Sequence, residues 1–278
     1  MKFQAFLPLV TYPDPNAEAI VAHAVAVASR LDAVLHARAL IPDFPPVSNT
    51  LSRLLLDLPR VIEDTEAASH ERGANLLAEV RKSAAAAGVE ATAGEITAPL
   101  AAIGDAAAAQ ARYHDFGLVG WESGNAASQM IAEAVIFGSG RPVVLLPELW
   151  DIAAIDHVAI AWDGGRAAAR AVADAQPLLA RAARISVLTV TDEKPLQEKD
   201  PGERLAEGLR RRGLPAETAA LRTEDCPISE TLQQRAIERG CNLLVMGGYG
   251  HSRIRDFVLG GATKGVLGDL LMPVLLSH

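Results

Sequence analysis

The 278-residue sequence predicts an α/β protein made of two tandem domains, each a doubly wound parallel sheet. Half of the residues are hydrophobic but only 4% are aromatic, which is typical of small-residue helices packed on a buried parallel sheet. Apolar runs alternate with Ala-rich segments of helical period, as in right-handed strand–helix–strand crossovers. The same order of runs then occurs a second time, which indicates an internal duplication with five strands in each half.

The expected elements follow one another in the same order in both halves. Strong apolar runs predict strands at residues 3–10, 33–40, 116–121 and 142–147, and again at 157–162, 184–190, 242–247 and 273–277. Weaker strands fit residues 90–96 and 217–222. Amphipathic segments predict helices that include residues 17–31, 99–114, 167–182 and 228–239.

The two halves can be registered against each other. Pro142-Val143 aligns with Pro273-Val274, and Tyr12 aligns with Asp163. The spacing between aligned positions changes along the chain because the first half carries a Pro-rich insertion at residues 41–62.

The first repeat ends near residue 152, which predicts domains at residues 1–152 and 153–278. Duplicated units usually pack about a pseudo-two-fold axis, so we expect an intramolecular pseudo-dimer in which a further homodimer is optional. The apolar last strands of the two halves, residues 142–147 and 273–277, are expected to pair edge to edge.

Composition argues against several classes of function. The net charge is −8 with no long basic run, which argues against a nucleic-acid surface. The N-terminus resembles no signal peptide and no apolar stretch reaches membrane-spanning length, so we expect a cytoplasmic protein without a membrane partner. Cys226 and Cys241 are read as reduced thiols, and the histidines show no metal-binding spacing.

A glycine-rich pattern marks the candidate site in the second half. The apolar run 242–247 leads into Gly247 and Gly250, and Gly260-Gly261 opens a short helix, which gives the spacing Gly-x2-Gly-x9-Gly. Glycines let a backbone turn tightly and approach a ligand closely. Because the N–H groups at a helix start attract phosphate, the pattern indicates a phosphate-bearing ligand.

Unusual residues also follow other predicted strands of this half. Asp163 follows the run 157–162, and Val190 closes the run 184–190. In an open parallel sheet, ligands bind at the carboxyl ends of the strands, near the point where the strand order reverses. Asp163, Val190 and Gly247 are therefore expected at one edge.

These segments resemble a known family when taken together. Ile160-Ala161-Trp162-Asp163-Gly164, Val187-Leu188-Thr189-Val190 and the segment from Val245 to Ser252 occur in the order found in a universal stress protein domain. The second half as a whole is similar to that family and the first half more weakly, so the chain resembles a tandem member. The resemblance implies an adenine nucleotide alpha hydrolase-like fold and a cytoplasmic role in the stress response.

The resemblance also implies a ligand, which is ATP or a related adenine nucleotide, with Mg²⁺ as an optional companion. Asp163 would lie beside the adenosine and Val190 would face the adenine. Gly247 and Gly250 would line the ribose and phosphates. Backbone N–H groups for the phosphates would come from Gly260, Gly261 and Ala262.

One position departs from the family pattern. Nucleotide-binding members have Ser or Thr after the last glycine, where this chain has Gly261, so one hydroxyl donor is missing. Thr263 follows two positions later and is a candidate replacement. Structural alternatives also stay open. Asp163 could cap the helix that begins near Gly165, and Gly247 and Gly250 could be turn residues only.

The first half lacks this set of residues. Tyr12 stands in place of Asp163, and Gln129-Met130 stand in place of Gly260-Gly261. Trp121-Glu122 lie at the end of the fourth strand, where a bulky ring and a carboxylate would oppose a phosphate by size and charge. We interpret this half as a degenerate partner, or as a binder of a non-nucleotide ligand near the Pro-rich insertion.

Three functions are compared on this basis. A nucleotide-binding regulatory module is favoured, because the chain has no Gly-x4-Gly-Lys-Ser/Thr loop and no clear nucleophile–base pair, so no catalytic residue is assigned. A slow ATP-hydrolysing or nucleotidyl-transfer enzyme would have to rely on Asp163, Asp192 and His251. An interaction protein with an empty glycine loop is the third alternative.

Overall fold

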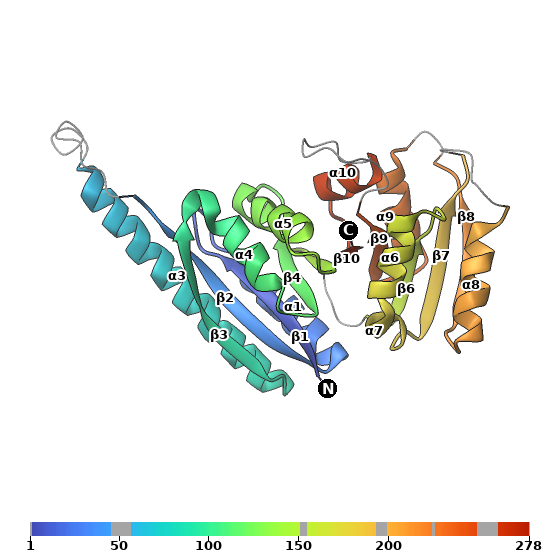
Figure 1. Ribbon diagram of the computed structural model, residues 1–278, viewed down its shortest axis with the longest axis horizontal. Helices are drawn as coiled ribbons and strands as arrows, with labels where there is room; N and C mark the ends of the chain where they lie inside the picture. Colours follow the sequence, from blue (N-terminus) through green and yellow to red (C-terminus); the bar gives the residue numbers. More distant parts are fainter. Residues whose placement is uncertain are drawn as a thin grey trace. The chain divides into compact units, whose positions relative to one another are not determined.

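The computed structural model describes residues 2–45, 57–150, 155–192, 199–223, 226–248 and 261–277. The chain divides into two compact units, Met1–Ser139 and Gly140–His278, each of which combines mostly parallel strands with helices (Figure 1). This arrangement confirms the predicted fold class of tandem α/β units. The boundary predicted at residue 152 lies outside the described residues, so the domains 1–152 and 153–278 stay a prediction.

The first unit is a parallel sheet with the strand order β3-β2-β1-β4. Its elements, in chain order, are β1 (Phe3–Val10), α1 (Glu18–Leu31), β2 (Ala33–Asp43), α3 (Leu58–Ala87), β3 (Ala91–Pro99), η1 (Leu100–Ala102), α4 (Ile103–Ala111), β4 (Phe116–Trp121) and α5 (Ala126–Gly138). Helices α1 and α3 contact each other, as do α4 and α5, and in Figure 1 α4 and α5 lie in front of the sheet with α3 behind it.

Helices α4 and α5 pack closely because small residues face each other at their contact. A Cβ atom added to Gly104 would lie 2.9 Å from the Cβ of Ala134, and one added to Gly138 would lie 2.9 Å from the Cβ of Ala108. Side-chain volume at these positions would push the helices apart. The contact therefore fixes α5, whose first residues follow β4 at the carboxyl edge of the sheet.

The second unit has the strand order β5-β10-β9-β6-β7-β8. Its elements are β5 (Val143–Pro147), β6 (His157–Ala161), α6 (Arg166–Asp174), α7 (Gln176–Leu179), β7 (Arg184–Val190), α8 (Pro201–Arg211), β8 (Ala216–Leu221), α9 (Ile228–Glu238), β9 (Leu243–Gly247), α10 (Gly261–Gly268) and β10 (Val274–Ser277). Strands β6 to β10 pair in parallel, whereas β5 pairs antiparallel with β10, with Val274 opposite Leu145.

The pairing of β5 with β10 confirms the predicted contact between residues 142–147 and 273–277. It also groups β5 with the second compact unit. Among the described residues the first unit therefore has four strands and the second has six. The prediction of five strands in each half is not confirmed by this division of the chain.

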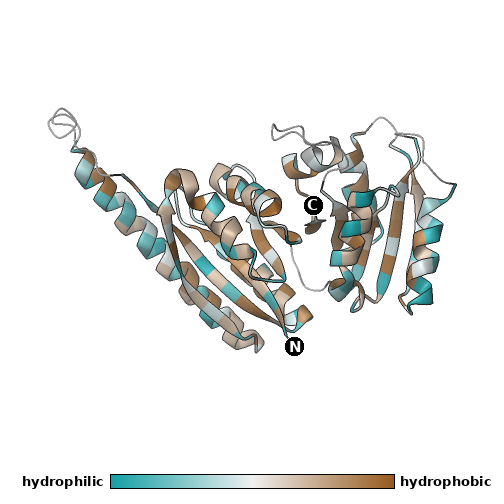
Figure 2. Cartoon of the chain, viewed as in Figure 1, coloured by the Kyte–Doolittle hydropathy of each residue, from teal (hydrophilic) through white to brown (hydrophobic). Residues whose placement is uncertain are grey.

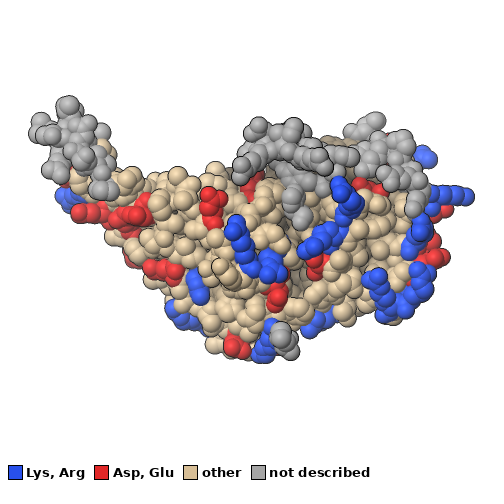
Figure 3. Space-filling model, in the orientation of Figure 1, with Lys and Arg blue, Asp and Glu red and all other residues tan. Residues whose placement is uncertain are grey.

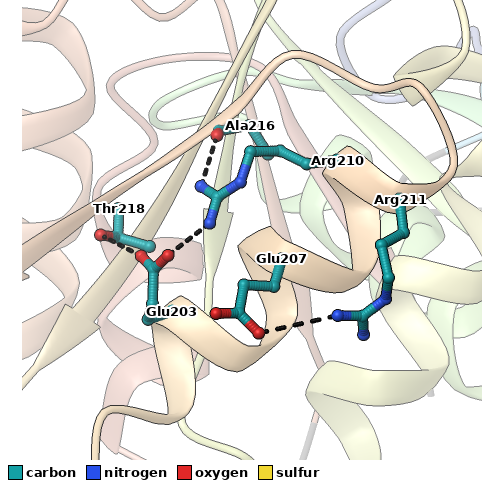
Figure 4. Close-up of polar contacts among 6 residues, drawn as sticks. All are labelled: Glu203, Glu207, Arg210, Arg211, Ala216 and Thr218. Atoms are coloured by element: carbon teal, nitrogen blue, oxygen red, sulfur yellow. Dashed lines mark hydrogen bonds and ion pairs between the residues drawn. The ribbon is translucent and has the colours of Figure 1, made fainter.

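Helix α8 covers the edge strand β8 with a network of polar contacts (Figure 4). Arg210 donates a hydrogen bond of 3.0 Å to the carbonyl oxygen of Ala216, and its guanidinium also pairs with Glu203. Thr218 donates a hydrogen bond of 3.2 Å to the same carboxylate. An edge strand presents unpaired backbone groups. The bond from Arg210 satisfies one of these groups, and the paired charges of Arg210 and Glu203 lie beside the edge.

Hydrophobic residues predominate in the strands, while α3 and α8 carry many hydrophilic residues (Figure 2). On the face drawn in Figure 3, acidic and basic side chains both occur over each unit. Among the described helices, none is long and apolar enough to cross a membrane. The strands therefore form the buried core of each unit, and the polar residues of a binding site can lie at the strand ends.

Candidate functional site

The strand order of the second unit reverses between β6 and β9. Strands β7 and β8 extend from one side of β6, whereas β9 and β10 extend from the other. Ala161 pairs with Leu188 and Ile160 pairs with Val245, so β6, β7 and β9 end at the same edge. Open α/β sheets bind ligands in the crevice at such a point, outside the carboxyl ends of the strands.

Asp163 lies at this edge, directly after β6 and Trp162. Its side chain is exposed, and its Oδ1 accepts a hydrogen bond of 2.8 Å from the backbone N–H of Gly165, the residue before α6. Gly164 between them has φ +76°, a conformation that favours glycine. This bond forms an Asx turn before α6 and is not a helix cap, because Gly165 is the N-cap residue and no side chain caps this helix. The turn holds an exposed carboxylate at the crevice.

Val190 and Gly247 occupy the ends of the two neighbouring strands. Val190 is buried at the end of β7, and Gly247 is half-buried at the end of β9. A Cβ atom on Gly247 would lie 2.4 Å from the carbonyl carbon of Ala167 and 2.7 Å from the backbone nitrogen of Ala168. The glycine therefore lets β9 touch the first turn of α6, a packing role that the sequence pattern did not reveal.

Helix α10 provides the remaining described candidates, Gly261, Ala262 and Thr263, in its first turn. The first N–H groups of a helix have no partner within the helix, so this turn presents donors. Ala262 is half-buried, and Thr263 is 4% exposed, which limits its hydroxyl as a replacement donor. The predicted loop residues Gly250 and Gly260 lie outside the described residues, as does His251.

The corresponding edge of the first unit is a cavity of about 660 Å³ with apolar walls. Tyr12, which takes the place of Asp163, lines it together with Phe44, and their rings meet edge to face at 5.2 Å. Met130 also lines it and is 45% exposed. This edge therefore differs chemically from the edge that carries Asp163.

Trp121 and Glu122 are both buried, and Glu122 is 4% exposed. The Glu122 carboxylate accepts hydrogen bonds from the Asn16 side chain at 2.6 Å, the Ala17 backbone N–H at 2.5 Å and the Asn125 side chain at 3.1 Å. The carboxylate thus joins β4 to the starts of α1 and α5. From the sequence, Glu122 is interpreted as a carboxylate that would repel a phosphate. The sequence does not predict this network, because Asn16 and Glu122 are 106 positions apart in the chain.

Each unit also holds a histidine near the amino ends of its strands. His157 Nε2 lies 2.9 Å from the hydroxyl of Ser186. His36 Nδ1 lies 2.9 Å from the hydroxyl of Thr92, and its Nε2 lies 2.7 Å from the side-chain oxygen of Gln4. In its own unit, each histidine thus lies toward the end of the sheet opposite the carboxyl ends of the strands.

Both histidines should make folding sensitive to acid. Burial lowers the pKa of His157 below its usual 6.5, and the charge of Arg184 adds to this. Burial likewise lowers the pKa of His36, with the charges of His114 and Arg38 acting in the same direction. Between pH 6.5 and the folded pKa the unfolded chain binds more protons, so stability should be fully present above 6.5 and fall below it.

Denaturant unfolding measured at about pH 7.5 and about pH 5.5 checks this expectation. Wild type should lose stability at the lower pH, and the double variant His36→Gln/His157→Gln should lose less over the same interval. An equal loss in both proteins would show that other groups cause the acid sensitivity.

The second half of the chain matches a known protein family. Residues 154–278 match the model of the Universal stress protein family. A universal stress protein from Archaeoglobus fulgidus DSM 4304 matches with a TM-score of 0.70 at 16% identity, covering 98% of this chain and 96% of that chain. A candidate universal stress protein from Pseudomonas aeruginosa UCBPP-PA14 matches with a TM-score of 0.57 at 13% identity, covering 99% and 93%.

A universal stress protein in complex with cAMP matches 44% of this chain and 97% of its own, at 22% identity and a TM-score of 0.33. No curated protein matches the sequence. At these identities the likeness to the Archaeoglobus fulgidus and Pseudomonas aeruginosa structures shows the fold of nearly the whole chain.

Proposed function

Because residues 154–278 belong to the universal stress protein family, we propose that the chain is a regulatory module that binds ATP or a related adenine nucleotide in its second unit. The observation that carries the proposal is the meeting of three strand ends at the switch point, where Asp163 follows β6 and where Val190 and Gly247 are the last residues of β7 and β9. The predicted domain 153–278 contains all of these residues.

The residues suit the parts of an adenine nucleotide. Asp163 presents an exposed carboxylate, held by Gly165, that can accept hydrogen bonds from the adenosine. Val190 offers an apolar surface to the adenine ring. The phosphates would bind the N–H groups at the start of α10, from Gly261 to Thr263, where the helix dipole also favours negative charge.

The loop glycines Gly250 and Gly260 would provide further phosphate contacts, with Mg²⁺ as a companion of the phosphates. No residue is assigned a catalytic role. Gly247 enters mainly through packing, because its lack of a side chain allows α6 and β9 to meet beside the crevice.

Calorimetric titration with ATP tests the proposal with a matched pair of variants. Ala262 and Ala127 both lie in the first turn of a helix, α10 in the second unit and α5 in the first. Glutamate is favourable in a first helical turn, so both variants should fold. We expect about one site per chain, and Ala262→Glu should weaken ATP at least roughly tenfold, because its carboxylate would meet the phosphates.

Ala127→Glu should leave ATP affinity unchanged. Two equal sites per chain, or an equal loss in both variants, would contradict a site confined to the second unit.

A further inference from the structure

The cavity of the first unit has the size of a small-molecule site. It encloses about 660 Å³, within the range of roughly 300–1,000 Å³ that is typical of ligand pockets. It lies at the carboxyl ends of β1 and β2, beside the starts of α4 and α5. The place is therefore one where parallel sheets bind ligands, although the residues of a nucleotide site are not there.

Its walls offer very little to a charged ligand. Among the described side chains that line it, only those of Thr11 and Tyr12 carry N or O atoms. The Thr11 hydroxyl is buried, donates to the carbonyl of Leu40 at 2.6 Å and lies 2.6 Å from the hydroxyl of Ser69. The polar capacity of Thr11 is thus already engaged within the protein.

The backbone around the cavity is also poor in donors. Four prolines line it, and proline has no N–H group: Pro13, Pro42, Pro45 and Pro99. The start of α5 is capped, because the side-chain oxygen of Asn125 accepts a hydrogen bond of 3.0 Å from the N–H of Ser128. A phosphate or carboxylate placed here would lose its hydration and gain few bonds in return.

Large apolar side chains nevertheless stay exposed at this cavity. Leu100 is 38% exposed and Met130 is 45% exposed, and both line it. Concave apolar surface in contact with water favours an apolar occupant, because burial of that surface releases free energy.

From the volume, the apolar walls, the prolines and these exposed side chains, we propose that the first unit binds one uncharged, largely hydrocarbon small molecule in this cavity. The ligand would contact Tyr12, Phe44 and Met130, which line the cavity, and would cover Leu100. The two units of the chain would thus hold ligands of opposite chemistry at equivalent edges of their sheets.

Titration of the full chain with Nile red, an uncharged hydrophobic fluorophore, tests the proposal. We expect saturable binding of about one molecule per chain with a blue shift of its emission. Decanol should displace the probe, decanoate should do so less well because of its charge, and ATP should not displace it. Absence of saturable binding, or displacement by ATP, would overturn the proposal.

Variants at exposed positions locate the probe. Met130→Glu and Leu100→Glu should each weaken Nile red roughly tenfold, because each replaces an apolar contact by a charge. Leu149→Glu is the matched control, since Leu149 is 94% exposed and does not line the cavity. An equal loss of affinity in the control, or no loss in both cavity variants, would place the probe elsewhere and refute the assignment.

Discussion

Replacing Gly247 by alanine should destabilise the second unit by about 3 kcal/mol, at the upper end of the usual cost of overpacking. The added Cβ would lie 2.4 Å from the carbonyl carbon of Ala167, and a backbone atom cannot move aside as a flexible side chain can. Relief requires α6 to shift away from β9, which would also displace the turn that contains Asp163. We therefore expect ATP binding to fall together with stability.

Denaturant unfolding followed by circular dichroism measures this effect. Gly208→Ala in α8 is the control, because a Cβ there would meet only the Arg211 side chain, at 3.8 Å. Alanine favours a helix over glycine by about 1 kcal/mol, so the control should be as stable as wild type or more so. If Gly247→Ala unfolds at the same denaturant concentration as wild type, the contact between β9 and α6 is not as close as described.

Replacing Glu122 by alanine should have a comparable effect on the first unit. Three donors, on Asn16, Ala17 and Asn125, would lose the carboxylate that accepts from them, and an unsatisfied buried polar group costs about 1–3 kcal/mol. We expect a loss of about 3 kcal/mol in total. Glu122→Gln should also destabilise the first unit. The NH₂ group of glutamine is a donor, and it would face another donor at a place where the carboxylate oxygen accepts.

The same unfolding experiment checks this expectation, with Glu71→Ala as the control. Glu71 is exposed on α3, so its removal should change stability by no more than about 0.5 kcal/mol. Equal effects of the Glu122 and Glu71 substitutions would mean that the buried network contributes nothing to folding.

Hydrophobic periodicity was enough to predict most of the fold. The weak strand predicted at residues 217–222 is confirmed as β8, Ala216–Leu221. The helix predicted at 167–182 is divided into α6 and α7, and Pro177, which lacks an N–H group, lies in the first turn of α7. The long helix α3 was not predicted, because its first residue, Leu58, lies within the Pro-rich insertion.

The candidate site was predictable only as far as it depends on strand ends. Asp163 follows one apolar run and Val190 closes another, so their place at one edge could be predicted from the sequence. The packing of Gly247 on Ala167 and the bonds of Glu122 to Asn16 depend on contacts between distant parts of the chain. The cavity was hidden for the same reason, since its walls come from the ends of several elements.

Amide hydrogen exchange of the full chain with and without ATP tests most directly whether the nucleotide site lies in the second unit alone. Slower exchange reports local stabilisation where a ligand binds. We predict slower exchange in peptides that cover residues 157–166, 184–192 and 261–268, and unchanged exchange in peptides that cover 8–14 and 116–131. Protection confined to the first unit, or no protection at saturating ATP, would contradict the account.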